Sequence, residues 1–206
     1  RVMPSSTRSD VVLPAPFGPS RPTTCPRWTV KSTEDTATNP SAYSNSVRGN
    51  APSTYWRLDE AGGPVVGSST SGAEGITVGG VSQGQAPAVL GGSSVTLDGS
   101  TGYVAAASPT THTDSYSQTA YFKTTTRVGG TIMGYSPDQT GAGPATGSDR
   151  VVFMENDGKI AFAQRAGTRF AFIRSATTFA DGRWHQFTAT YGAGIMNLYV
   201  DGDLQA

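Results

Sequence analysis

The sequence predicts an all-β protein built as two antiparallel sheets. Short runs rich in Thr, Val, Tyr and Phe recur along the chain, and Gly or Asp-Gly separates them. Residues 181–202 form the clearest hairpin signal, since apolar and polar residues alternate on both sides of a short Gly-Ala-Gly loop. No segment shows the helical period over three turns. Strands joined by tight turns therefore account best for the pattern.

The hairpin shows how the two faces of a strand are distinguished. Asp-Gly turns close the segment "DGRWHQFTATYGAGIMNLYVDG" at both ends. Side chains two residues apart share a face of a strand. The residues predicted to share the apolar face are Phe187, Ala189, Tyr191, Met196, Leu198 and Val200.

Earlier strands are predicted from the same signals. They lie at residues 55–58, 75–78, 94–97, 102–105, 116–125, 131–135, 150–155, 159–162 and 169–173. Ala120 and Phe122 share one face of the long strand that begins at Tyr116. The aromatic residues expected in the core are Trp56, Tyr103, Tyr121 and Trp184, with Trp184 buried between the sheets.

The composition divides the chain near residue 41. The first 40 residues hold seven of the 13 prolines but only one of the 26 glycines. Pro/Ser/Thr/Arg-rich sequence without periodicity buries too little apolar surface to offset the entropy of ordering it. We therefore expect residues 1–41 to be a linker or a disordered tail and residues 42–206 to be the folded domain. A basic binding arm and a segment that is not native sequence are the alternatives for 1–41.

Charge and cysteine content exclude several classes of function. The 15 basic and 15 acidic residues balance, so nucleic acid is not an expected partner. No apolar run is long enough for membrane insertion. A single cysteine cannot form an internal disulfide, so the fold depends on its core.

Five blocks in order give the domain a family resemblance. They are "YWRLDEAGG", "VTLDGSTGYV", "AYFKTTTRVGGTIMGYS", "DRVVFMENDGKIAF" and the closing hairpin. Residues 42–206 resemble laminin-G-like, concanavalin-A-like domains of the bacterial type. The resemblance implies a two-sheet jelly-roll sandwich. It also implies a non-catalytic module that binds a carbohydrate or an extracellular protein, in adhesion, within a larger cell-surface or extracellular bacterial protein with other domains.

Two other roles fit the same resemblance. One is an accessory binding module of a secreted glycosidase or sialidase, and the other is a structural spacer repeat in a surface protein. Members of the family usually continue past the "VDG" turn through two more strands. Because this sequence stops at Ala206, we expect a domain that is incomplete at its C-terminus.

Catalytic chemistry has little support in the sequence. A glycosidase needs two carboxylates flanking one bond, and the closest strand-associated pair is Glu155 with Asp157, which belongs to a turn. His112 and His185 stand far apart, and Cys25 has no neighbouring base. We therefore expect no enzyme activity.

Calcium is the one cofactor that the resemblance implies. The acidic position before the "RVVFMENDG" hairpin is Asp149, and Asp138 lies in the preceding loop. Calcium takes six to eight oxygen ligands, so these two residues form at most half a site. For ligand binding, the aromatic and cationic residues in or beside loops are the candidates, namely Tyr135, Arg165 and Phe179.

Overall fold

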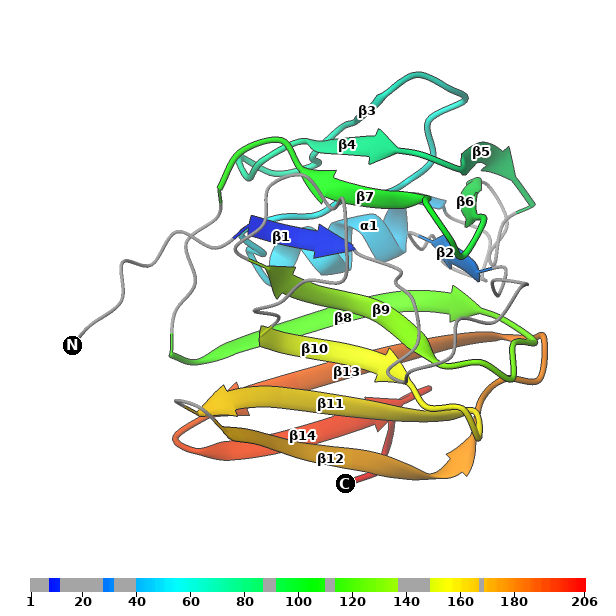
Figure 1. Ribbon diagram of the computed structural model, residues 1–206. Coiled ribbons are helices and arrows are strands. Elements are labelled where there is room, and N and C mark those ends of the chain that lie inside the picture. The colour runs from blue at the N-terminus through cyan, green and yellow to red at the C-terminus, as the bar shows by residue number, and fades with distance from the viewer. Residues whose placement is uncertain are drawn as a thin grey trace.

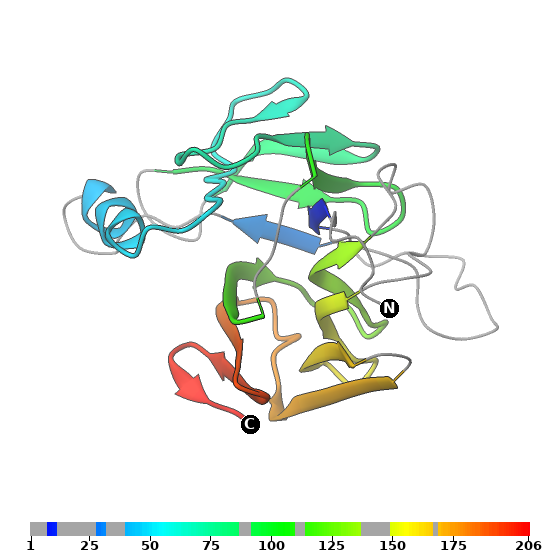
Figure 2. The same cartoon turned by 90° about the vertical axis from the view of Figure 1, so that its left-hand side faces the viewer.

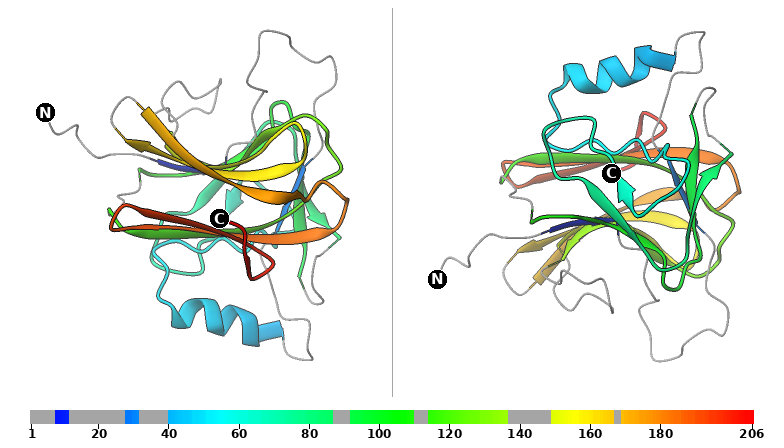
Figure 3. Two further views of the ribbon diagram at one scale, coloured as in Figure 1. Left: turned by 90° about the horizontal axis from the view of Figure 1, so that it is seen from below. Right: turned by 90° about the horizontal axis from the view of Figure 1, so that it is seen from above.

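Two antiparallel sheets face each other in the computed structural model, which describes residues 8–11, 28–31, 40–86, 92–109, 114–136, 149–166 and 169–206. Figure 1 shows one sheet in front of the other, and Figure 3 shows the two layers edge-on. Every strand pair is antiparallel. The predicted two-sheet antiparallel sandwich is confirmed.

The eight-stranded sheet carries the surface that matters below. Its strands, in spatial order, are β12 (Arg169–Thr178), β11 (Lys159–Ala166), β10 (Asp149–Met154), β9 (Gly130–Ser136), β1 (Arg8–Val11), β7 (Tyr103–Ala106), β4 (Gly75–Val78) and β3 (Val65–Val66).

The seven-stranded sheet contains the predicted hairpin. Its strands, in spatial order, are β15 (Asp203–Leu204), β14 (Ile195–Val200), β13 (Trp184–Gly192), β8 (Tyr116–Lys123), β2 (Trp28–Lys31), β6 (Ser94–Leu97) and β5 (Val81–Gln85).

Apolar side chains from both sheets fill the space between them. The largest side chains that are fully buried are Phe122, Phe162, Phe187, Leu97, Ile132, Met154, Ile160, Leu198, Val66 and Val95. Phe187, Ala189, Leu198 and Val200 are all buried, as the hairpin pattern predicts. Tyr191 and Met196 pack against the same core from partly buried positions. Burial of this set is the main source of stability, because the contribution scales with the apolar area removed from water.

One helix covers part of the outer face of the seven-stranded sheet. Helix α1 (Pro40–Gly49) lies outside this sheet in Figures 2 and 3. Its Tyr43 ring meets the Tyr121 ring edge-on at 6.3 Å, and Gln186 Nε2 donates a hydrogen bond to the Tyr43 hydroxyl at 3.2 Å. The sequence did not predict this helix, because a ten-residue helix depends on tertiary packing more than on its own propensity.

Trp184 corrects one expectation about the core. The side chain is only half-buried and, by strand parity, shares the outward face with Gln186, whose side chain reaches α1. Successive side chains of a strand alternate between faces, so Phe187 faces inward and Trp184 faces outward. The prediction that Trp184 is buried between the sheets is wrong. Tyr121 likewise lies on the outward face, beneath α1.

Two strands come from the segment expected to be a linker. Strand β1 lies between β7 and β9, and β2 lies between β6 and β8. Both fill central positions, where they satisfy backbone hydrogen-bonding groups of their neighbours. At these residues, and at the start of α1, the structure differs from the expected linker. The remaining positions of 1–39 lie outside the described residues, and the domain boundary stays a prediction.

The region around residues 55–58 is less regular than predicted. It contributes one isolated bridge, between Trp56 and Ser68, rather than a strand. Leu58 adopts a φ of 56°, which interrupts an extended conformation. Strand β5 was missed because "VSQGQ" is polar and contains Gly84, with a φ of 66°.

Candidate functional site

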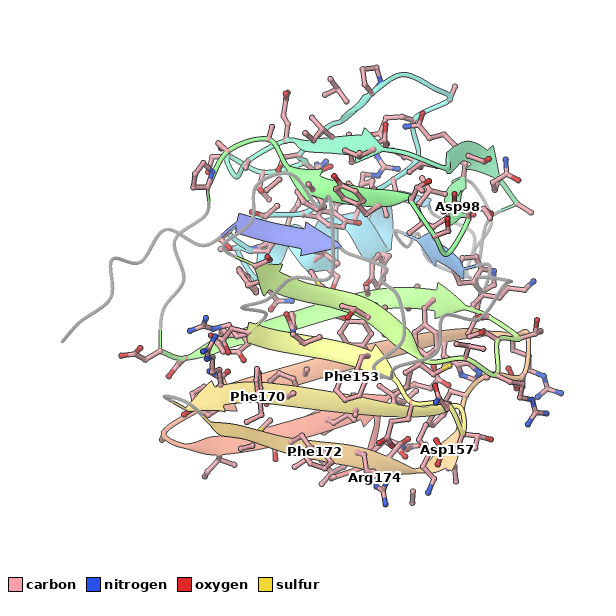
Figure 4. The ribbon with its side chains drawn as sticks, in the orientation of Figure 1. Asp98, Phe153, Asp157, Phe170, Phe172 and Arg174 are labelled. Atoms are coloured by element: carbon pink, nitrogen blue, oxygen red, sulfur yellow. The ribbon has the colours of Figure 1, made fainter. Side chains whose placement is uncertain are left out.

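The outer face of the eight-stranded sheet exposes aromatic side chains on its last strands. Phe170 and Phe172 of β12 are 52% and 59% exposed. Phe153 of β10 is half-buried on the same face, and Figure 4 shows the three rings with Arg174 over β10 to β12. We call Phe153, Phe170, Phe172, Arg165 and Arg174 the aromatic face.

Strand parity explains why these residues point outward. Ile173 packs against the core, so its neighbours Phe172 and Arg174 face the opposite side. The same alternation on β11 buries Ile160 and Phe162 in the core and turns Arg165 outward.

The register brings the aromatic face together from three strands. Phe172 lies opposite Ala163, and Arg174 lies opposite Ala161, which in turn pairs with Phe153. Both alanines are buried, so the larger side chains on either side close over them. The three rings therefore lie on one face of neighbouring strands, with Phe170 and Phe172 about 7 Å apart along β12.

Two arginines give this surface a polar component. The Arg165 guanidinium lies over the Phe170 ring, 5.9 Å from its centre. Arg174 Nη1 pairs with Glu155 Oε2 at 3.4 Å. A cation over an aromatic face is attracted to the ring quadrupole. The surface thus combines flat apolar rings with directed hydrogen-bond donors.

The three ligand-binding candidates from the sequence do not come together. Arg165 belongs to the aromatic face. Tyr135 lies beneath the buried guanidinium of Arg150, at 5.8 Å, and Phe179 packs edge-on against His185 at 5.0 Å and against the core. A direct role for Tyr135 or Phe179 in ligand binding stays a prediction.

Phe170 and Phe172 were missed by sequence reasoning. In "RFAFIRS" both parities carry apolar side chains, since Ala171 and Ile173 alternate with the two phenylalanines. Pattern alone cannot tell which parity faces the core. The available signal was the larger size of the phenylalanines beside Arg165 and Arg174, which is typical of binding surfaces.

The calcium position can be tested against the contacts of Asp149. Its Oδ1 accepts hydrogen bonds from the backbone N–H groups of Arg150 and Arg165, at 2.8 and 2.9 Å. Its Oδ2 pairs with Arg150 Nη1 at 2.7 Å. Both oxygens are thus engaged, and a cation already neutralises the carboxylate. In this arrangement Asp149 does not fit a calcium ligand.

Other acidic residues do not complete a metal site in the part of the chain that the structure describes. No group of three or more His, Cys, Asp or Glu side chains there could hold a metal ion. Asp138 lies outside the described residues. Calcium binding therefore stays a prediction.

A buried polar cluster surrounds Arg150 at the same end of the sandwich. The guanidinium lies over the Tyr116 ring at 5.1 Å, and the Tyr116 hydroxyl donates to Gln164 Oε1. Burial raises the pKa of Tyr116 well above its ordinary range. Arg150 Nε and Gln118 Oε1 have no hydrogen-bond partner among the described residues. This cluster joins the two sheets, since Tyr116 and Gln118 come from β8.

The contacts of His185 are typical of a structural residue and not of a catalytic one. Its Nδ1 lies 2.6 Å from Asp201 Oδ2, and its Nε2 lies 3.0 Å from Asp181 Oδ1. The side chain is only 11% exposed. Partial burial acts to raise the pKa of Asp181, but the Arg183 N–H and His185 outweigh it and lower that pKa. The imidazole thus ties together the two Asp-Gly turns that close the hairpin.

Asp98 fixes the loop between β6 and β7. Its Oδ1 accepts from the N–H groups of Ser100, Thr101 and Gly102, at 2.8 to 2.9 Å, and its Oδ2 accepts from the Thr101 hydroxyl at 2.8 Å. Partial burial opposes them, yet these bonds lower the pKa of Asp98 to about 2. A carboxylate so fully engaged holds its own loop rather than a ligand.

The carboxylates considered for glycosidase chemistry also have other partners. Glu155 pairs with Arg174, as described, and Asp157 accepts a hydrogen bond from the Lys159 N–H at 3.0 Å. His112 and Cys25 lie outside the described residues.

Comparison with known proteins gives one family. Residues 98–206 match the laminin-G-type family model described as the concanavalin A-like lectin/glucanases superfamily. Neither the curated proteins nor the solved structures give a match to the chain. Among the described residues, no helix is long and apolar enough to cross a membrane. The matched region covers more than half of the chain and contains β7 to β15, the aromatic face included, so the chain belongs to the concanavalin A-like lectin/glucanases superfamily.

Proposed function

We propose that this protein is a non-catalytic carbohydrate-binding module of a larger extracellular bacterial protein, and that the aromatic face binds the glycan. Membership of a lectin-type superfamily suggests a binding module in general. The observation that carries the finer proposal is the adjacent exposure of Phe170 and Phe172.

The chemistry of the aromatic face suits sugar rings. One side of a pyranose ring presents C–H groups that pack on a flat aromatic ring, while the hydroxyls around its rim need hydrogen-bond partners. Phe170 and Phe172 offer two such rings in a line, and Arg165 and Arg174 offer donors beside them. A line of rings along a strand suits a chain of sugar units better than a single terminal sugar.

The distribution of exposed apolar residues supports a specific surface. Among the described residues, the other large hydrophobic side chains that are exposed are Val65, Ile195 and Leu204, each on a different strand. Single exposed apolar residues are normal on protein surfaces, whereas clusters mark interaction sites.

A glycan array followed by affinity electrophoresis tests the proposal. The 206-residue chain should bind at least one class of polysaccharide, and Phe170→Ala and Phe172→Ala should each weaken that binding at least tenfold. Ile195→Ala removes an equally exposed apolar side chain from the other sheet and should leave binding unchanged. If both phenylalanine variants bind as well as the unsubstituted chain, the glycan site is not the aromatic face. If the chain binds proteins and no polysaccharide, the ligand is a protein and not a glycan.

A further inference from the structure

Strand β12 differs from the other three strands that end the two sheets. In the part of the chain that the structure describes, each sheet has two terminal strands with only one hydrogen-bonded neighbour, and these are β12, β3, β15 and β5. Strands β3 and β15 have two residues each, and β5 has five with a shift in its register. Strand β12 has ten residues. Short or irregular edge strands prevent unwanted pairing between chains, and β12 lacks that protection over most of its length.

The stretch of β12 that is available for pairing is regular. From Arg169 to Arg174 it pairs with β11 without a break in register. The irregularity comes afterwards, where the Ser175 hydroxyl accepts a hydrogen bond from the Ile160 N–H. Figure 3 (left) looks towards this side of the sandwich, and β12 lies at the margin of its sheet.

From this edge we propose that two copies of the chain associate through antiparallel pairing of β12 with β12, with a two-fold axis at Phe172. The proposal goes beyond glycan binding and does not depend on it. Antiparallel pairing of a strand with itself about one residue is an isologous contact, the type that generates closed dimers.

The sequence of the edge is self-complementary in that register. On the outward face, Phe172 lies opposite Phe172 of the second copy, and Phe170 lies opposite Arg174 of the second copy. Aromatic pairs and aromatic–cation pairs across strands are stabilising, and the chain already places Arg165 over Phe170 in this way.

The inward face of β12 agrees with the same register. Ala171 lies opposite Ile173 of the second copy, so both partners are apolar. Ala171 is exposed in the single chain, whereas Ile173 already packs against the core. Pairing at β12 therefore extends both the core layer and the outer layer of the sheet.

A charge-swap experiment tests the axis directly. Opposite residues of an antiparallel pair have Cβ atoms about 5 Å apart, where like charges repel and opposite charges attract. Phe172→Glu and Phe172→Lys should each be monomeric in sedimentation velocity, while the equimolar mixture should form a dimer. Ile195→Glu is the matched control, since it charges an equally exposed apolar site on the other sheet, and it should dimerise like the unsubstituted chain.

Several outcomes would overturn the proposal. If the chain stays monomeric across a wide concentration series, the β12–β12 contact does not form. The β12 edge would then be available for pairing with an extended segment of another protein. Dimers that persist in Phe172→Glu, or a mixture that is not rescued, place the contact elsewhere. Circular dichroism of each variant confirms folding. The backbone N–H groups of Phe170, Phe172 and Arg174 point away from β11, since those of Ala171 and Ile173 face it, so amide exchange at these three residues that slows with concentration gives an independent readout.

Discussion

The outer faces of the two sheets differ in how far their aromatic side chains are exposed. On the seven-stranded sheet, α1 covers Tyr121, and its Tyr43 is held by Gln186. On the eight-stranded sheet, Phe170 and Phe172 remain exposed. Both outer faces thus carry aromatic residues, but those on one sheet pack beneath a helix of the same chain and those on the other are exposed. The covered face contributes to stability, and the open one is available to a ligand.

A substitution in the core between the two sheets should have the largest effect on stability, and the effects of substitutions on the outer faces can be compared with it. Phe187→Ala should lower the free energy of unfolding by about 3–5 kcal/mol, because it removes a fully buried ring and leaves a cavity. Urea denaturation measures the loss. A change no larger than that of a surface variant would mean that the sheets do not close on this residue.

Loss of the helix contact should have the next largest effect. Tyr43→Ala removes an aromatic pair and a hydrogen bond, which are worth about 0.5–1.5 kcal/mol each. We expect a loss of about 1–3 kcal/mol in unfolding free energy and no change in glycan binding. Tyr43→Phe separates the two contributions, since it keeps the ring and removes the hydroxyl. If Tyr43→Ala is as stable as the wild type, packing of α1 on the seven-stranded sheet does not contribute to stability.

Asp98 lies on neither outer face, and its ionisation provides a test that depends on pH. Its folded pKa of about 2 lies below the ordinary value of 3.8, so its stabilising effect is complete above about pH 4. The effect is lost as the pH falls from there towards 2. The difference in melting temperature between the wild type and Asp98→Asn should therefore shrink over this range. A difference that stays constant down to pH 2 would contradict the lowered pKa.

Truncation on the open face should affect stability least. At concentrations where the chain is monomeric, Phe172→Ala should change the unfolding free energy by no more than about 0.5 kcal/mol, because the ring is 59% exposed in the single chain. A loss comparable to that of Tyr43→Ala would show that the ring already packs within its own chain, and the contrast between the two faces would disappear.

The sequence predicted the core more fully than the outer surfaces. Phe187 and Leu198 follow from strict alternation, because polar residues mark the opposite face. Trp184 was misplaced because its size suggested burial although its parity pointed outward. Phe170 and Phe172 could not be assigned, since both parities of β12 are apolar.

The remaining features depend on contacts between distant segments. Strands β1 and β2 pair with neighbours that lie far along the chain. The sequence of β1, RSDV, has no apolar alternation, and that of β2, WTVK, alternates over only four residues. The pairing of His185 with Asp181 and Asp201 required the hairpin register to be known. The calcium expectation came from resemblance alone, and the contacts of Asp149 with Arg150 are not visible in the spacing of acidic residues.

The small size of the other sheet edges has a consequence for growth beyond two copies. A chain with two long, compatible edges can add further chains at each end and extend into a fibre. Once β12 is paired with its counterpart, the described strands left at the margins are β3, β15 and β5, with two, two and five residues. Such short strands offer few backbone groups to an incoming chain. Pairing through the described edges should therefore stop at two subunits and not continue into a polymer.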